Sequence, residues 1–291
     1  MPQNRLTQLE IQRRINRRID AANAAAIGNV CYSIATLMND PAQLEAMHDS
    51  MRAGGFDGPD CEYLWIDNTG HAGETIGAYV GINAMLNAAR GDYVIACHQD
   101  IRLLTQTREN LDRRLAELDS LDADWALAGN AGGVAPGKLA IRITDPHGAN
   151  QYIGTLPARV ASLDENFIVI RRNSRIGCSN DLDGFHFYGA DLCLNAATAG
   201  WTSYVIDFHL AHLSAGKKGD TFETMQEAFR AKWSRAFAPR WIQTTCALIH
   251  LSAGPVSQFA GRIAHAPYHK IVRRIPGASG WNRSNKKEIV R

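Results

Sequence analysis

The strongest constraint on the fold of this chain is a regular alternation of strand-like and helix-like segments across residues 30–118. Three short, apolar, β-prone segments occur there, and each is followed by a segment with helical patterning. Parallel strands need such crossover helices, so the alternation predicts an α/β fold with a doubly wound, mostly parallel sheet. We expect strands at Val30–Leu37, Glu62–Ile66 and Tyr93–Cys97, and helices at Ala42–Arg52, Glu74–Ala89 and Leu104–Leu118.

Polar side chains follow each of these three predicted strands. They are Asn39, Asp67 and Asp100. Ligands of open α/β sheets bind at the carboxyl ends of the strands, so we expect these side chains to line one crevice. A carboxylate at this edge could hold a divalent cation, and the cation could neutralise a diphosphate. The alternative for Asp100 is a turn residue that caps the next helix.

The pattern changes after Ser120. Short strand candidates separated by Gly, Pro, Asn and Asp indicate a mixed region with a small antiparallel part. A helix at Leu192–Ala199 and a strand at Ser203–Phe208 follow, and Thr221–Phe237 is a further helix. The short strands are expected at Trp125–Ala128, Lys138–Thr144, Arg159–Leu163 and Phe167–Arg171.

Several classes of protein are disfavoured by motifs that the chain lacks. No GxGxxG follows the first strand, and neither GxxxxGK[ST] nor GxSxG occurs, which disfavours dinucleotide-binding, P-loop and α/β-hydrolase sites. No apolar run approaches the roughly 20 residues of a membrane-spanning helix, and the N-terminus lacks the apolar region of a secretory signal. The six cysteines form no CxxC pair, so we expect a reduced, cytoplasmic protein.

Basic residues are concentrated near the C-terminus. The net charge of the chain is +2, but residues 262–291 carry eight Lys or Arg and one Glu. This segment predicts peripheral contact with an anionic membrane at its inner face, in preference to nucleic acid, which we do not expect as a partner. The alternative is an ordinary solvated tail.

Several passages, in the right order, resemble GT-A-fold glycosyltransferases of family 2, and in particular the bacterial StrF-like sugar transferases. The likeness covers roughly residues 29–246, and its most specific parts are the CHQD and FHFYGADLCL passages. It implies a Rossmann-like GT-A domain at 28–215, with a nucleotide-binding half (28–120) and an acceptor-binding half (121–215). An amphipathic N-terminal helix (1–27), striped by Ile11, Ile15 and Ile19, would precede the domain. A helical C-terminal extension with a basic tail (216–291) would follow.

The resemblance also implies roles for individual residues. Asp100 and His212 would bind Mn²⁺ or Mg²⁺, although His98 stands where the family commonly has the first acid of a DxD motif. The nucleotide would contact Met38, Asn39, Asp67, Asn68, Asn83 and Gln99. The donor sugar or acceptor would contact Asp164, Glu165, His186 and Tyr188, and phosphate would contact Lys217 and Lys218. His212 as a core or capping histidine, and the two lysines as ordinary surface residues, remain the alternatives.

Asp191 is the expected catalytic base. Inverting glycosyl transfer needs a group that takes the proton of the acceptor hydroxyl, and Asp191 precedes the helix predicted at Leu192–Ala199. Relatives in the resembled family often carry an acid at the position of Gly189, which bears on the choice of base. The alternative role for Asp191 is that of a carboxylate favoured by the helix dipole.

The sequence therefore predicts an inverting, metal-dependent glycosyltransferase. Its donor would be a nucleotide-diphosphate sugar, with a UDP-sugar favoured, and its acceptor a glycan or a lipid-linked sugar in bacterial polysaccharide assembly. A nucleotidyltransferase is a second enzymatic hypothesis, but the Gly-rich basic loop expected after its first strand is missing at Leu37–Pro41. A GT-A-like binding protein without turnover is the third hypothesis. A homo-oligomer is compatible with the sequence.

Overall fold

The computed structural model describes residues 7–19, 30–70, 75–214, 216, 219, 221–244 and 248–272. The chain divides into two compact units, one ending at Gln226 and the other beginning at Glu227. The first unit contains the α/β fold that was expected from the strand–helix alternation, and each unit is described by itself below.

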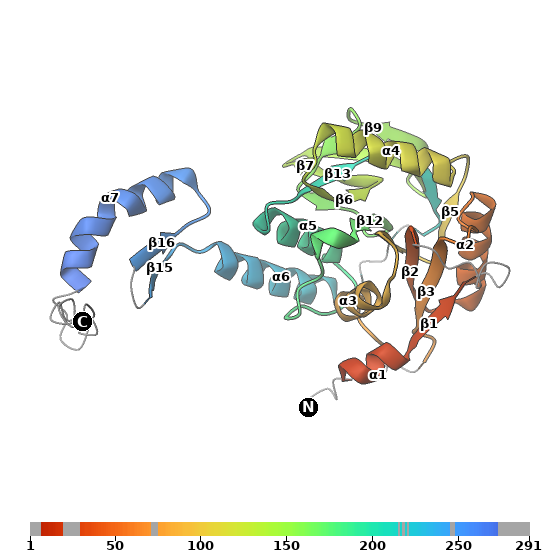
Figure 1. The fold of residues 1–291 in the computed structure, drawn as a ribbon, viewed down its shortest axis with the longest axis horizontal. Coiled ribbons are helices and arrows are strands. Elements are labelled where there is room, and N and C mark those ends of the chain that lie inside the picture. Colours follow the sequence, from red (N-terminus) through yellow and green to blue (C-terminus); the bar gives the residue numbers. More distant parts are fainter. Residues whose placement is uncertain are drawn as a thin grey trace, which may run out of the picture. The chain divides into compact units, whose positions relative to one another are not determined.

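An eight-stranded sheet forms the centre of the first unit (Figure 1). Its strand order is β1-β3-β2-β4-β12-β6-β13-β10, with parallel pairing in β3–β2–β4 and in β6–β13. Because β12 is antiparallel to both β4 and β6, those five strands share one direction, and the predicted mixed α/β class with a mostly parallel sheet is confirmed. The strands are β1 (Ile15–Arg18), β2 (Tyr32–Met38), β3 (Cys61–Asp67), β4 (Tyr93–Cys97), β6 (Trp125–Gly129), β10 (Ala158–Arg159), β12 (Phe167–Arg171) and β13 (Thr202–Val205).

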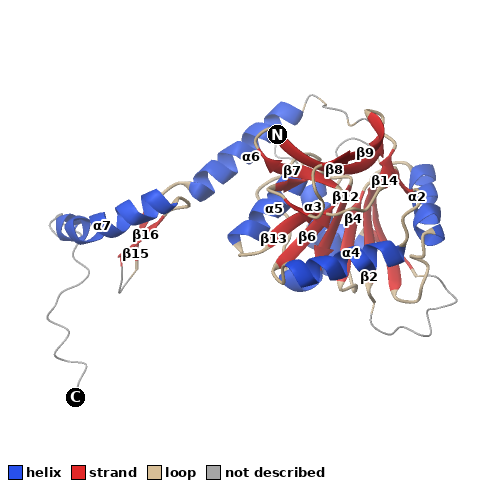
Figure 2. Ribbon diagram, turned by 90° about the horizontal axis from the view of Figure 1, so that it is seen from above, coloured by secondary structure: helices blue, strands red, loops and turns tan. Residues whose placement is uncertain are grey.

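A second, smaller sheet contains the antiparallel part of the fold (Figure 2). Its central strands β8 and β14 are parallel to each other, and its other pairings are antiparallel. The pairing of β5 with β14 sets His212 opposite Ile101, directly after the polar segment that ends the central strand β4. The strands are β5 (Ile101–Leu103), β7 (Ala131–Ala135), β8 (Lys138–Asp145), β9 (Gly148–Ile153), β11 (Ser162–Leu163) and β14 (Leu210–His212).

Helices cover both faces of the central sheet (Figure 1). Helices α2 (Pro41–Ala53) and α4 (Arg108–Leu121) pack their apolar residues with those of β2 and β4 into one core cluster. Helix α3 (Ala78–Ala88) lies on the opposite face, where its Gly81 approaches the side chain of Leu37 on β2. Helix α2 begins as its sequence predicts, with Pro41 in the first turn and Asp40 accepting hydrogen bonds from two backbone N–H groups.

The predicted amphipathic helix over residues 1–27 is wrong in the part that can be described. Helix α1 spans only Gln8–Arg13, and the next residues form β1, which pairs antiparallel with β3. The pairing covers the free edge of β3 and brings Arg17 to 3.3 Å from the buried carboxylate of Glu62. Of the predicted apolar stripe, Ile11 is buried in the helix, whereas Ile15 lies on the strand.

Other predicted helices also begin elsewhere. The helix expected at Glu74–Ala89 is α3, which begins at Ala78. The helix expected at Leu104–Leu118 is α4, which starts at Arg108 because Thr107 caps it, while Leu103 ends β5. The helix expected at Leu192–Ala199 is α5 (Tyr188–Thr198), so that Asp191 lies within its first turn instead of before it.

The second unit contains a hairpin as well as the predicted helices. Helix α6 (Phe222–Phe237) crosses from the first unit, and β15 (Arg240–Gln243) pairs with β16 (Leu248–Leu251). Helix α7 (Pro255–Val272) packs against this hairpin, with the Tyr268 ring stacked on Trp241 at 4.6 Å between centroids. Among the residues the structure describes, no helix combines the length and apolarity needed to cross a bilayer. The basic tail beyond Val272 lies outside the described residues.

Candidate functional site

A cavity of about 550 Å³ opens at the carboxyl ends of β2, β3 and β4. The position follows from the sheet, because the in-register pairing of β2 with β3 places Met38 beside Asp67 and so aligns the polar segments that follow. The volume lies within the usual range of small-molecule sites. Ten residues predicted from the sequence line it: Met38, Asn39, Asn68, Gln99, Asp100, Asp164, Glu165, His186, Tyr188 and His212.

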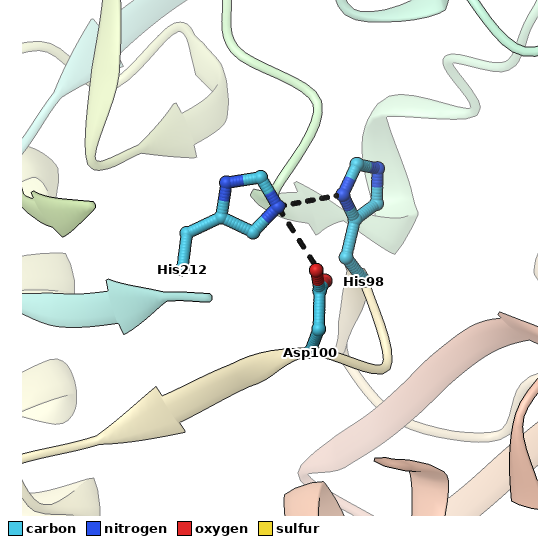
Figure 3. A group of neighbouring side chains, drawn as sticks. All are labelled: His98, Asp100 and His212. Carbon is cyan, nitrogen blue, oxygen red and sulfur yellow. Dashed lines mark hydrogen bonds and ion pairs between the residues drawn. The ribbon is translucent and has the colours of Figure 1, made fainter. Parts of the chain in front are cut away.

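Three of the lining residues could bind a metal ion together. His98, Asp100 and His212 each offer a ligand atom, and these atoms lie within 4.8 Å of one another (Figure 3). The His212 Nε2 atom is 3.2 Å from His98 Nδ1 and 3.4 Å from the Asp100 carboxylate. The sequence predicted Asp100 and His212 as ligands, and the structure adds His98, the residue that replaces the first acid of the DxD pattern.

The hydrogen bonds around Tyr188 determine which nitrogen of His98 faces the cluster. The Tyr188 hydroxyl donates to the Glu165 carbonyl oxygen at 2.9 Å, since a carbonyl can only accept. Its oxygen therefore accepts the contact from His98 Nε2, 3.0 Å away, and the neutral ring carries its proton there. The lone pair of His98 Nδ1 is thus directed toward Asp100 and His212 and is suited to a cation.

Electrostatics in the cluster agree with this assignment. Burial and the nearby His212 lower the pKa of His98, which keeps its ring neutral. Burial acts to raise the pKa of Asp100, but hydrogen bonds from His212 and Ser214 outweigh it, and the pKa falls well below its ordinary value. Burial would likewise lower the pKa of His212, yet its hydrogen bond with Asp100 raises it overall. A carboxylate anion thus lies in a cluster with two imidazoles, and the three groups offer ligand atoms to a cation.

Gln99 connects the segment after β4 to the segment after β2. Its side-chain oxygen accepts hydrogen bonds from the backbone N–H groups of Asn39 (2.9 Å) and Asp40 (3.0 Å), while its amide nitrogen donates to the Asn39 side chain. A similar role is played by Asn68, which exchanges two hydrogen bonds with the backbone of Ile76. These amides hold the polar loops in place around the cavity.

Glu165 lies at the N-terminus of α5 and lines the same cavity. Its carboxylate accepts a long hydrogen bond of 3.4 Å from the backbone N–H of Gly189. Burial, together with the like charge of Asp164, raises the pKa of Glu165 to about 8. Phe187 caps the helix in the left-handed conformation (φ 68°), which is uncommon for a bulky residue and directs the first N–H groups of the helix toward Glu165.

The structure does not support Asp191 as the base. This residue is fully buried and does not line the cavity, because α5 starts three residues before it and turns its side chain inward. Its carboxylate accepts hydrogen bonds from the Ser179 backbone N–H, the Ser179 hydroxyl and the Asn195 side chain, at 2.7 to 3.1 Å. The alternative reading, a carboxylate in the first turn of a helix, fits these contacts.

Two further predicted residues, Asp67 and Asn83, do not line the cavity, and two others lie outside the residues that the structure describes. Asp67 is exposed and accepts two hydrogen bonds from Thr69. Asn83 holds the loop at Cys178 by exchanging two hydrogen bonds with its backbone. The structure does not describe Lys217 and Lys218.

Aromatic side chains form one wall of the cavity. Phe185 is 45% exposed and lines the cavity together with His186. Behind them, the ring of Phe222 lies 5.2 Å from that of His186 and 4.9 Å from that of Phe187, between centroids. An exposed aromatic face beside polar groups is suited to a ligand with both apolar and hydroxyl surfaces.

Comparison with known proteins gives a relative in sequence and more distant solved structures. No protein-family model matches the chain. The mannosyltransferase PcManGT of Pyrobaculum calidifontis, solved with GDP-Man and Mn²⁺, is 14% identical, with a TM-score of 0.48 over 75% of this chain and 68% of that one. GalNAc-T7, solved with UDP, GalNAc and Mn²⁺, is 10% identical, with a TM-score of 0.45 over 70% of this chain and 49% of that one. Similarity at this level does not establish a shared activity.

The relative is a protein of Fuscovulum blasticum named ATP synthase subunits region ORF 6, a name that states no activity. It is 32% identical over 231 residues, which cover 77% of this chain and 91% of the relative. The chain therefore belongs to the same protein family as the ORF 6 protein of Fuscovulum blasticum.

Proposed function

We propose that this protein is a metal-dependent glycosyltransferase with a GT-A arrangement that inverts the configuration of the transferred sugar. The observation that carries the proposal is that one cavity of about 550 Å³ is lined both by a cluster suited to a cation and by a carboxylate suited to accept a proton. Glycosyl transfer from a nucleotide-diphosphate sugar needs these two features on either side of the reacting carbon.

The cluster fits a divalent cation, and its donor set favours Mn²⁺ over Mg²⁺. Two imidazole nitrogens and one carboxylate oxygen are available from His98, Asp100 and His212. Mg²⁺ prefers a shell of oxygens, whereas Mn²⁺ accepts nitrogen ligands more readily. Three protein ligands leave coordination positions open for the oxygens of a diphosphate. When bound, the cation would offset the negative charge that develops on the departing diphosphate.

The nucleotide would occupy the part of the cavity at the ends of β2 and β3. Met38, Asn39 and Asn68 line this part. The preference for UDP over GDP rests on the sequence resemblance, which assigns base recognition to Asp67. Lys217 and Lys218 are proposed phosphate contacts on the same ground.

We assign the base to Glu165 in place of Asp191. In the transfer step, the acceptor hydroxyl oxygen bonds to the anomeric carbon while the bond from that carbon to the diphosphate oxygen breaks. Glu165 takes the hydroxyl proton, and the nucleoside diphosphate leaves. A base must be open to the acceptor and must have a pKa high enough to take up a proton near neutral pH, and the raised pKa of Glu165 meets the second condition. The first is met because Glu165 lines the cavity.

Gly189 explains how Glu165 reaches this position. A Cβ atom at residue 189 would lie 2.3 Å from the Leu163 carbonyl oxygen and 3.3 Å from Glu165 Cγ. The glycine therefore leaves room for the Glu165 side chain where the resembled family often carries an acid. The acceptor, a glycan or a lipid-linked sugar, would lie against Phe185 and His186. The reaction would then serve polysaccharide or glycoconjugate assembly.

Calorimetry and product analysis together test the proposal. We expect UDP or GDP to bind with Mn²⁺ and to bind at least tenfold more weakly without it, and His98→Gln to weaken Mn²⁺ binding about 10- to 100-fold. Leu139→Ser, a change at an exposed position of β8, is the matched control. Released nucleoside diphosphate supports sugar transfer. Release of pyrophosphate would favour a nucleotidyltransferase, and nucleotide binding without turnover of any tested sugar would favour a binding protein.

A further inference from the structure

Helix α7 in the second unit packs one face against the hairpin, and an apolar face lies on its other side. The covered face is directed at β15 and β16: Gly261 approaches the His250 ring so closely that a Cβ atom would lie 2.0 Å from it. On the same face, His265 Nε2 contacts the Leu248 carbonyl oxygen at 2.9 Å, and Tyr268 stacks on Trp241. The spacing of these three helix residues, i, i+4 and i+7, marks one side of the helix.

The opposite side of α7 is apolar and exposed. Its large side chains are Val256 (81% exposed), Phe259 (65%), Ile263 (63%) and Ile271 (60%). The spacing i, i+3, i+7 and i+15 places them on a single stripe, turned away from the residues that contact the hairpin. Within the part of the chain that the structure describes, nothing buries this stripe. An apolar helix face of this extent is typical of an interaction surface.

Charge identifies the kind of partner. Residues 227–291 contain twelve Lys or Arg and only two Glu, a net charge of +10, whereas residues 1–226 carry −8. Helix α7 itself contains Arg262 and Lys270 and no acidic residue. Arg262 lies at the edge of the apolar stripe and Lys270 in the last turn of the helix. An apolar helix face with such cations and no acids is suited to lie in the plane of an anionic bilayer, where the stripe enters the acyl boundary and the cations meet lipid phosphates.

We infer that α7 is an interfacial helix that attaches the protein to anionic membranes through the Val256–Ile271 stripe. The inference extends the sequence-based expectation, which rested on charge in residues 262–291 alone, because it places the apolar anchor before most of that charge. It does not depend on the catalytic proposal. Attachment of this kind would suit an enzyme with a lipid-linked acceptor. Because lipid binding can be measured without any acceptor, its test is separate from the test of the glycosyltransferase proposal.

Vesicle flotation of the full chain tests the inference. We expect the protein to float with vesicles of phosphatidylcholine and phosphatidylglycerol, and much less with phosphatidylcholine alone. The double variant Phe259→Ser/Ile263→Ser should reduce binding about tenfold or more, because it removes two apolar anchors. Arg262→Gln and Lys270→Gln should each reduce it up to about fivefold, with the loss shrinking at high salt.

The control double variant is Leu121→Ser/Leu139→Ser, which changes exposed apolar residues of the first unit and should float like the wild type. Circular dichroism checks that each variant keeps its helices, which is expected because the altered side chains are exposed. Absence of flotation in the wild type would overturn the inference, as would equal flotation of Phe259→Ser/Ile263→Ser. A wild-type dimer that dissociates in that variant, measured by light scattering without lipid, would also overturn it, since the stripe would then cover a second copy.

Discussion

Two carboxylates near the first turn of α5 have opposite surroundings: Glu165 lies beside the N-terminus of the helix, and Asp191 lies within its first turn. Glu165 lines the cavity and faces the backbone N–H groups of Phe187, Tyr188 and Gly189, the last at 3.4 Å. Asp191, inside the first turn, is fully buried and receives three shorter hydrogen bonds from Ser179 and Asn195. Glu165 is open to a ligand, and its surroundings disfavour the anion. Asp191 is out of reach of a ligand, and its oxygens already accept hydrogen bonds.

This difference shows that a carboxylate near a site is not for that reason able to act as a base. The hydrogen bonds to Asp191 join α5 to the loop at Ser179, and Asn83 on α3 holds the neighbouring residue, Cys178. Asp191 therefore stabilises the helix whose N-terminus presents N–H groups to Glu165. In this interpretation one carboxylate supports the element on which the other depends.

The largest expected effect follows from Glu165→Gln. The amide keeps the shape of the side chain but cannot accept the proton of the acceptor, so kcat should fall about 10²- to 10⁴-fold. Binding of the nucleoside diphosphate with Mn²⁺, measured by calorimetry, should change less than about twofold. Steady-state kinetics with a sugar acceptor measure the loss. If kcat survives in Glu165→Gln and disappears in a folded Asp191→Asn protein, the base belongs at residue 191 after all.

A smaller effect, on stability, is expected from Asp191→Asn. The new amide nitrogen would face donors from Ser179 or Asn195, leaving at least one buried donor without its partner, and the free energy of unfolding should fall by about 1–3 kcal/mol. Urea denaturation measures this loss. Ser179→Ala, which removes one neutral hydroxyl donor, is the milder companion variant at roughly 1 kcal/mol. At a temperature where Asp191→Asn is folded, its kcat should stay within about threefold of the wild type.

The sequence predicted most of the cavity because strand ends are local features. The runs before Asn39 and Asp100 have the length and composition of buried strands, and parallel strands bring their ends together whatever the details of packing. The metal cluster needed one long-range fact, the approach of β14 to β5, which the resemblance supplied through His212.

The errors concern features that depend on where an element begins or on distant pairing. The side chain of Asp191 is buried because α5 starts at Tyr188, so the residue lies inside the helix on its packed side and not in the loop before it. The segment after Arg13 has a stripe that suits a helix, but β3 offers an open edge about 50 residues away in the chain. The environment of Glu165 likewise comes from N–H groups more than 20 residues later.

The pH dependence of stability provides the subtlest test of the contrast. Burial and the like charge of Asp164 raise the pKa of Glu165 from 4.5 to about 8 in the folded protein. Between these values the folded state retains a proton that the unfolded chain has lost, so the wild type loses stability as the pH rises through this window. Glu165→Gln carries no titratable group there. Its stability relative to the wild type should therefore increase from about pH 5 to about pH 8 and then level off.

Parallel denaturation series of the two metal-free proteins measure this difference. Since both contain the same remaining titratable groups, subtracting the curves isolates Glu165 as far as its neighbours are unchanged. A difference that is flat across the window would contradict the assignment, because it would mean that the carboxyl ionises in the folded protein as it does in the unfolded chain. Activity should agree in sign: kcat/KM of the wild type should rise with pH up to about 8, as the base becomes able to accept a proton.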